Sequence, residues 1–199
     1  MSSSSKRAQR RRTAYHEAGH AVANQHHDVP FRSITIRSDA NSYGHVRVYA
    51  HRLTADHVYN PSPRVRDHLE RLVVCLLAGR EAERLVASRY NHLGAGHLRM
   101  GKYARLSPGS DLDQAIDYAG RVVSLEGEEG RAYFHWLTQR TRAFVTRRHD
   151  EIAAVADALI ERETLTADEV RDVVWQSLQD RISIQNRRSL PSAPAPVHG

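Results

Sequence analysis

The segment Tyr15-His16-Glu17-Ala18-Gly19-His20-Ala21-Val22 decides how this chain is interpreted. It contains H-E-x-x-H, and on a helix the i, i+4 spacing of His16 and His20 puts both imidazoles on one face, one turn apart. Two imidazole nitrogens at about 2.0–2.1 Å from a metal suit Zn²⁺. Glu17 could then face a water on the open metal position and act as general base when that water attacks a peptide bond. The segment therefore predicts a metal-binding helix that carries its own catalytic carboxylate.

The competing interpretation is a surface helix with two titrating histidines, because the chain holds 13 histidines among 199 residues. The surrounding residues are small or helix-compatible: Ala14, Ala18, Ala21, Val22 and Ala23. Only Gly19 opposes a helix, by about 1 kcal/mol relative to Ala. A small residue between two ligands often marks a close packing contact. This context favours the metal helix.

Length and composition indicate one domain with tails. The single cysteine, Cys75, cannot form an internal disulfide, so we expect a core thiol and a cytoplasmic location. No apolar run approaches 18 residues and no secretory signal begins the chain, so no membrane insertion is expected. The net charge is +6, and much of the surplus lies in 6–12. We interpret this stretch as a solvated basic arm, with nucleic-acid binding the less favoured alternative.

Hydrophobic periodicity predicts a mainly α fold: a zincin-like metal helix with a short β-hairpin, packed in a helical bundle. We expect a disordered basic arm at 1–10, the domain at 11–183, and a disordered Arg/Ser/Pro/Ala tail at 184–199. The metal helix should begin within 7–13 and end near Gln25. Further helices are predicted at 63–88, 110–126, 128–149 with a continuation or restart near 150, and 166–180. Strands are predicted at 31–37 and 43–49, and irregular structure at 88–109.

The second strand has two interpretations. In zinc peptidases an edge strand near the metal commonly binds the substrate backbone by strand addition, which makes 44–49 a candidate substrate-binding strand. A hairpin with no substrate role fits the pattern equally well.

The residues alone leave the third metal ligand open. His26 has the spacing of the longer pattern H-E-x-x-H-x-x-G-x-x-H, but Ala23 stands where that pattern needs glycine. Glu83 could orient a ligand histidine or lie on the surface. Asp111 could be a ligand or simply favour the start of its helix. His27 is a weaker candidate than His26, and His92 and His97 are the remaining rivals. His45, His51 and His57 are expected to be surface residues.

Taken together, four segments resemble the peptidase domain of the FtsH family, the membrane-tethered AAA+ zinc proteases. They are residues 13–22, 77–83, 109–115 and 156–165, in the family's order, and the resemblance covers about residues 11–175. Ala78 replaces the first glycine of the family's Gly-Gly-Arg-x-Ala-Glu segment. The resemblance implies that His16, His20 and Asp111 bind Zn²⁺, that Glu17 is the catalytic base, and that Glu83 is a buried carboxylate near the site or an alternative ligand.

The sequence departs from the family in having no P-loop G-x-x-x-x-G-K-[ST] and no room for an ATPase domain. We therefore expect a stand-alone zinc metalloendopeptidase, ATP-independent on its own, that cleaves peptides or unfolded proteins or works with a separate ATPase. The resemblance also implies a possible homo-oligomer, a hexamer. The alternative is a non-catalytic peptidase-like module that binds a protein or nucleic-acid partner; an intact Glu17 argues against it.

Overall fold

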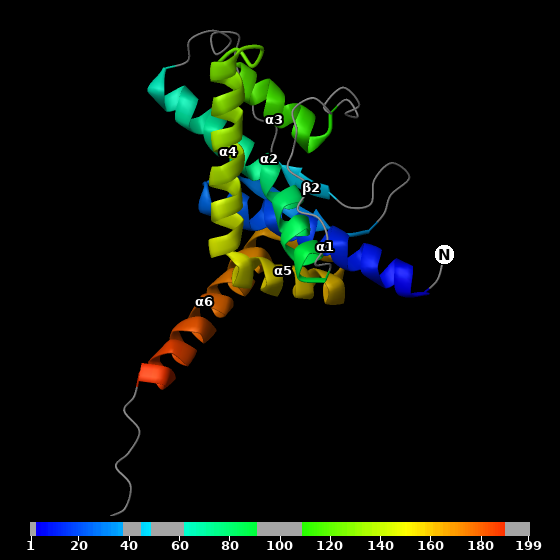
Figure 1. Ribbon diagram of the computed structural model, residues 1–199. Coiled ribbons are helices and arrows are strands. Elements are labelled where there is room, and N and C mark those ends of the chain that lie inside the picture. Colours follow the sequence, from blue (N-terminus) through cyan, green and yellow to red (C-terminus); the bar gives the residue numbers. More distant parts are fainter. Residues whose placement is uncertain (1–2, 38–44, 49–61, 91–108, 190–199) are drawn as a thin grey trace, which may run out of the picture.

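The computed structural model describes residues 3–37, 45–48, 62–90 and 109–189, which form six helices and a small sheet (Figure 1). The elements in chain order are α1 (Ser3–His26), β1 (Phe31–Thr35), β2 (His45–Val48), α2 (Pro63–Tyr90), α3 (Asp111–Gly120), α4 (Glu128–Arg147), α5 (His149–Arg162), β3 (Thr164–Thr166) and α6 (Ala167–Ser189). The predicted mainly α fold with a short hairpin is confirmed. In the described residues no helix is both long enough and apolar enough to cross a bilayer.

The sheet has the strand order β2-β1-β3, and both pairings are antiparallel. Ile34 lies opposite Val46 in β2 and opposite Leu165 in β3, so β1 is the central strand. The hairpin of β1 and β2 was predicted. β3 was not, because Thr164–Thr166 is too short to show alternation and its last residue also opens a helix. The capping box of Thr166 and Glu169 is present, with the Glu169 carboxylate accepting from the Thr166 backbone N–H at 2.8 Å.

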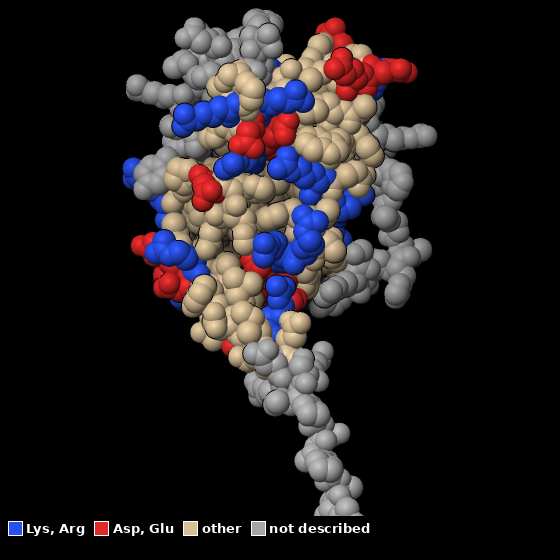
Figure 2. Space-filling model, turned by 90° about the vertical axis from the view of Figure 1, so that its left-hand side faces the viewer, with Lys and Arg blue, Asp and Glu red and all other residues tan. Residues whose placement is uncertain are grey.

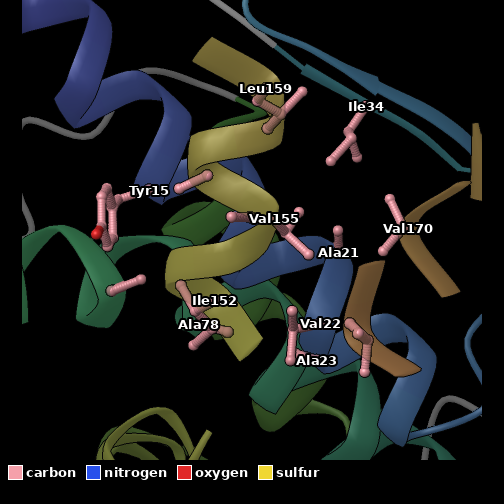
Figure 3. Close-up of a cluster of buried hydrophobic side chains, with 14 of the residues drawn as sticks. Tyr15, Ala21, Val22, Ala23, Ile34, Ala78, Ile152, Val155, Leu159 and Val170 are labelled. Atoms are coloured by element: carbon pink, nitrogen blue, oxygen red, sulfur yellow. The ribbon is translucent and has the colours of Figure 1, made fainter. Parts of the chain in front are cut away.

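The larger of two hydrophobic clusters joins α1 to the sheet and to the helices around it (Figure 3). Val22 of α1, Ile34 of β1, Val155 of α5 and Val170 of α6 point toward one another and are fully buried. A second cluster joins α2, α3 and α4 around Leu112, Phe134 and Leu137. Since α2 contributes to both clusters, it connects α1, which carries H-E-x-x-H, to α3.

α1 and α2 approach closely where both carry small residues. A Cβ on Gly19 would lie 2.7 Å from the backbone oxygen of Ala78 and 2.8 Å from the Cβ of Ala82. These distances are shorter than van der Waals contact, so only glycine fits at this crossing. The glycine that opposes helix formation in the sequence is therefore required by the packing.

Two termini differ from the prediction. α1 begins at Ser3 rather than after a disordered arm at 1–10, because no glycine or proline interrupts residues 3–18. Arg10 connects the first part of α1 to the end of α5. Its guanidinium donates to Glu163 Oε1 at 3.0 Å and to the Ile160 backbone oxygen at 2.8 Å. α6 likewise continues to Ser189, beyond the predicted boundary at 184, since the first proline comes at position 191.

Other differences are smaller. α3 ends at Gly120 rather than near 126. Most of the segment 88–109, predicted to be irregular, and residues 190–199 of the predicted tail lie outside the described residues. The last part of α6 extends away from the bundle (Figure 1), and the large apolar side chains of Trp175, Ile182 and Ile184 are exposed on it.

Candidate metal centre

His16 and His20 lie on the face of α1 that is directed toward α2 and α3. Their ring centroids are 4.6 Å apart and their Nε2 atoms 3.0 Å apart. The helix that the H-E-x-x-H spacing predicted is therefore formed, and it brings the two imidazole edges together. His20 is buried and His16 is partly buried.

Asp111 is the first residue of α3 and completes the cluster. Its Oδ2 atom lies 3.2 Å from His16 Nε2 and 3.1 Å from His20 Nε2. The Ser110 side chain caps α3 by accepting from the Asp113 backbone N–H at 3.3 Å, which fixes where the helix starts. Within the described residues, His16, His20 and Asp111 form a group whose ligand atoms could hold a metal ion.

The other ring nitrogens fix the tautomer of both histidines. His20 Nδ1 lies 2.8 Å from the backbone oxygen of Cys75, which can only accept, so Nδ1 carries the proton. His16 Nδ1 lies 2.6 Å from Glu83 Oε1 and donates to that carboxylate. Burial raises the pKa of Glu83, but the hydrogen bonds from His16 and Arg12 lower it by more. The pKa is therefore below its ordinary value, which favours the charged carboxylate. The Nε2 atoms of both histidines then face each other and Asp111 Oδ2.

Two imidazole nitrogens and a carboxylate oxygen thus converge on one point. Burial lowers the pKa of His16, but the bonds to Asp111 and Glu83 outweigh it and raise the pKa to about 10. Burial raises the pKa of Asp111, whereas the two histidines hold it far below its usual range. Both shifts indicate a point that attracts positive charge. Ligand atoms around a tetrahedral zinc lie about 3.3 Å apart, so the observed distances of 3.0–3.2 Å fit this ion.

Glu17, the predicted base, is buried on α1 between the two histidines in sequence. Burial raises its pKa, although the charges of His20 and His16 oppose the shift. A carboxylate with a raised pKa is a stronger base than an ordinary surface glutamate and suits proton transfer near neutral pH.

Three features of the centre were not predicted from the sequence. Arg12 donates from Nε to Glu83 Oε2. The backbone oxygen of Cys75 orients His20. A Cβ on Gly79 would overlap His20 Nε2 and lie 2.9 Å from the His16 backbone oxygen, so glycine is required beside the centre. The glycine in the 77–83 segment was a sequence signal for this contact, whereas a backbone carbonyl leaves no trace in the sequence.

The other candidates lie elsewhere. His26 Nε2 donates to Glu151 Oε2 at 2.6 Å and lies outside the cluster. His45 belongs to β2, whereas His51, His57, His92 and His97 lie outside the described residues. In the described sheet β2 is an edge strand, as the substrate-binding interpretation of 44–49 requires, but residues 44 and 49 themselves are not described.

Comparison with known proteins finds that the chain is similar to part of several ATP-dependent zinc metalloproteases. It is 29% identical, over 87% of its length, to ATP-dependent zinc metalloprotease FtsH 3 of Symbiobacterium thermophilum, and 27% identical, over 96% of its length, to the FtsH of Acidimicrobium ferrooxidans. It is 28% identical, over 81% of its length, to the chloroplastic/mitochondrial FTSH 11 of Arabidopsis thaliana. The chain spans 31%, 32% and 21% of these relatives. No protein-family model matches it. The relationship to the FtsH family that the sequence motifs indicated is confirmed.

Proposed function

The chain is related to the FtsH family of ATP-dependent zinc metalloproteases, and from this premise we propose that it is a zinc-dependent endopeptidase. Residues 11–183 would form the peptidase domain. The observation that carries the proposal is the convergence of His16 Nε2, His20 Nε2 and Asp111 Oδ2 within 3.0–3.2 Å of one another.

His16, His20 and Asp111 would hold the zinc ion, with Glu83 orienting His16 and the Cys75 carbonyl orienting His20. Three protein ligands leave the open position that a catalytic zinc requires. Bound there, Zn²⁺ would polarise the scissile carbonyl and lower the pKa of a water molecule to about 7.

Glu17 would act on the proton of the attacking water. Its carboxylate would take that proton and deliver it to the nitrogen of the leaving amine, so that the peptide bond breaks without releasing a free amide anion. The burial that raises the pKa of Glu17 supports the first half of this transfer, because a raised pKa makes the carboxylate a better proton acceptor.

The substrates would be peptides or unfolded proteins, which can approach the centre as an extended backbone. β2 is an edge of the described sheet, so its free side could pair with such a backbone by strand addition. Hydrolysis of an unfolded chain needs no ATP; a separate ATPase would be needed only for folded substrates. A hexamer, as expected from the resemblance, would be compatible with this role.

The first test is zinc content and casein hydrolysis for the wild type, Glu17→Gln and Glu161→Gln, an exposed glutamate of α5 that serves as the matched control. We expect one zinc per chain in all three proteins, cleavage by wild type and control, and at least a 10²-fold loss in Glu17→Gln.

The outcomes separate the two functions that the sequence left open. Zinc binding without cleavage of unfolded casein by the wild type would favour a peptidase-like binding module. Absence of zinc from the wild type, under conditions that load a known zinc peptidase, would remove the metal assignment and the mechanism with it.

A further inference from the structure

A single carboxylate, that of Glu83 on α2, receives two donors from α1. His16 Nδ1 lies 2.6 Å from Oε1, and Arg12 Nε donates to Oε2. Arg12 and His16 are four residues apart, so they project from the same face of the helix. The two oxygens of Glu83 are therefore engaged in opposite directions, one toward the metal centre and one toward solvent.

The burial of the three side chains gives Arg12 a specific place in this arrangement. The exposed fractions are 66% for Arg12, 18% for Glu83 and 25% for His16. Arg12 thus lies on the solvent side of a largely enclosed carboxylate. Without Arg12, water would take its place on Oε2. A water molecule does not fix the rotation of the carboxylate, on which the contact between Oε1 and His16 depends.

We propose that Arg12 is a positioning residue of the metal centre: it locks the Glu83 carboxylate so that His16 presents Nε2 to the ion, and thereby raises the affinity for zinc. The proposal rests on the proposed zinc site but concerns a residue outside the ligand set. Whether removing Arg12 weakens or tightens zinc binding distinguishes this role from a simple effect of charge. If Arg12 acted only through its positive charge, it would repel Zn²⁺ and its removal would tighten binding.

Neighbouring arginines of α1 do not share this contact. Arg10 is directed to Glu163 and the Ile160 backbone oxygen, and Arg11 contacts Tyr15. Arg7 is exposed on the same helix, five residues before Arg12. Arg7→Gln removes the same charge from α1 as Arg12→Gln and is therefore the matched control.

The experiment measures the zinc dissociation constant by competition with a chromophoric chelator, at fixed pH and ionic strength, on the full chain. We expect Glu83→Gln to weaken binding 10–100-fold and Arg12→Gln, one contact further out, about 3–10-fold. Arg12→Lys should recover part of the loss, since it keeps the charge and a donor but not the planar fork. Arg7→Gln should bind as the wild type.

A double variant tests whether Arg12 acts through Glu83. Once Glu83 is glutamine, adding Arg12→Gln should cause no further loss, because the two residues form one chain of contacts. Unchanged or tighter binding by Arg12→Gln, or losses that add in the double variant, would overturn the proposal.

Two further measurements distinguish a loss of positioning by Arg12 from a folding defect. Zinc binding by the wild type distinguishes failure of this proposal from failure of the zinc assignment itself. The melting temperature of the metal-free Arg12→Gln protein should equal that of the wild type, while the visible spectrum of its Co²⁺ form should shift as His16 reorients. If the wild type itself binds no zinc, the proposed function and this proposal both fail. If it binds zinc and Arg12→Gln binds equally well, only this proposal fails.

Discussion

At the scale of single residues, the centre requires that position 79 has no Cβ atom. Gly79 lies in α2, where alanine would ordinarily be better by about 1 kcal/mol. Its missing side chain leaves the space that the His20 ring occupies: a Cβ there would lie 2.7 Å from His20 Cδ2 and 2.9 Å from the His16 backbone oxygen. The requirements of the metal centre therefore override the preference of the helix.

We expect Gly79→Ala to weaken zinc binding at least 10-fold and to lower the free energy of unfolding by about 1–3 kcal/mol, because overpacking outweighs the gain in helix propensity. Chelator competition and urea denaturation measure the two effects. Gly120→Ala is the control, since a Cβ at Gly120 meets no atom within 4 Å. A Gly79→Ala protein that binds zinc as tightly as the control would contradict the packing argument.

Glu151 is a second residue whose charge is held by specific partners. It is almost fully buried and accepts from His26 at 2.6 Å and from Arg148 at 3.0 Å. Burial raises its pKa, but these two bonds lower it below the ordinary value of 4.5. Because the folded-state pKa is depressed, the carboxylate stabilises the fold above about pH 4.5, and this contribution is lost as the pH falls through the folded-state pKa.

Glu151→Gln should therefore lower the free energy of unfolding at pH 7 by about 2 kcal/mol and make the remaining stability less sensitive to acid. Urea denaturation at a series of pH values from 7 to 3 measures both. Asp157→Asn, an exposed change on the same helix, is the control. If the stability of wild type and Glu151→Gln falls in parallel on acidification, the pKa of Glu151 is not depressed by folding.

At the scale of elements, the proposed third ligand, Asp111, is placed by the start of α3. Asp111 is the first helical residue, and the Ser110 cap fixes that start. Ser110→Ala should destabilise the protein by about 1 kcal/mol and weaken zinc binding severalfold, because Asp111 would no longer be held at one backbone position. Ser110→Thr keeps the capping hydroxyl and should retain both properties. Equal zinc affinity in Ser110→Ala, measured with a chelator, would mean that packing of α3 alone positions Asp111.

The same scale shows how far the sequence could predict the structure. The helices and the hairpin follow from local patterns, and H-E-x-x-H specifies the relative position of two ligands because both lie on one helix. Asp111 is 95 residues from His16, so only the family resemblance indicated it. The Arg12–Glu83 contact spans 71 residues and involves a side chain that local composition assigns to a solvated arm. α1 begins earlier and α6 ends later than predicted. The prediction placed helix ends at capping residues, but no glycine or proline stops either helix there.

At the scale of the whole molecule, several arginines of the described residues pair locally with carboxylates. Glu70 accepts from Arg66 and Arg140, and Glu81 accepts from Arg84 and Arg142. On the face shown in Figure 2, acidic side chains are interspersed among the basic ones.

Zinc should stabilise the whole molecule, because its ligands belong to distant parts of the chain. α1 supplies His16 and His20, and α3, which packs against α2 and α4, supplies Asp111. An ion that binds all three favours the folded state over the unfolded chain, in which the ligands are apart. At a free zinc concentration 100-fold above the dissociation constant the gain is about 2.7 kcal/mol, which for a chain of this length corresponds to about 5–10 °C in melting temperature.

Calorimetry of the metal-free protein with and without Zn²⁺ measures this shift, and Mg²⁺ at the same concentration should produce none, since it prefers oxygen ligands. Asp111→Asn should lose most of the shift, because a neutral amide replaces the carboxylate that joins α3 to α1. If the variant keeps the full shift, α3 is not connected to α1 through the ion, and the metal is bound by His16 and His20 with a ligand other than Asp111.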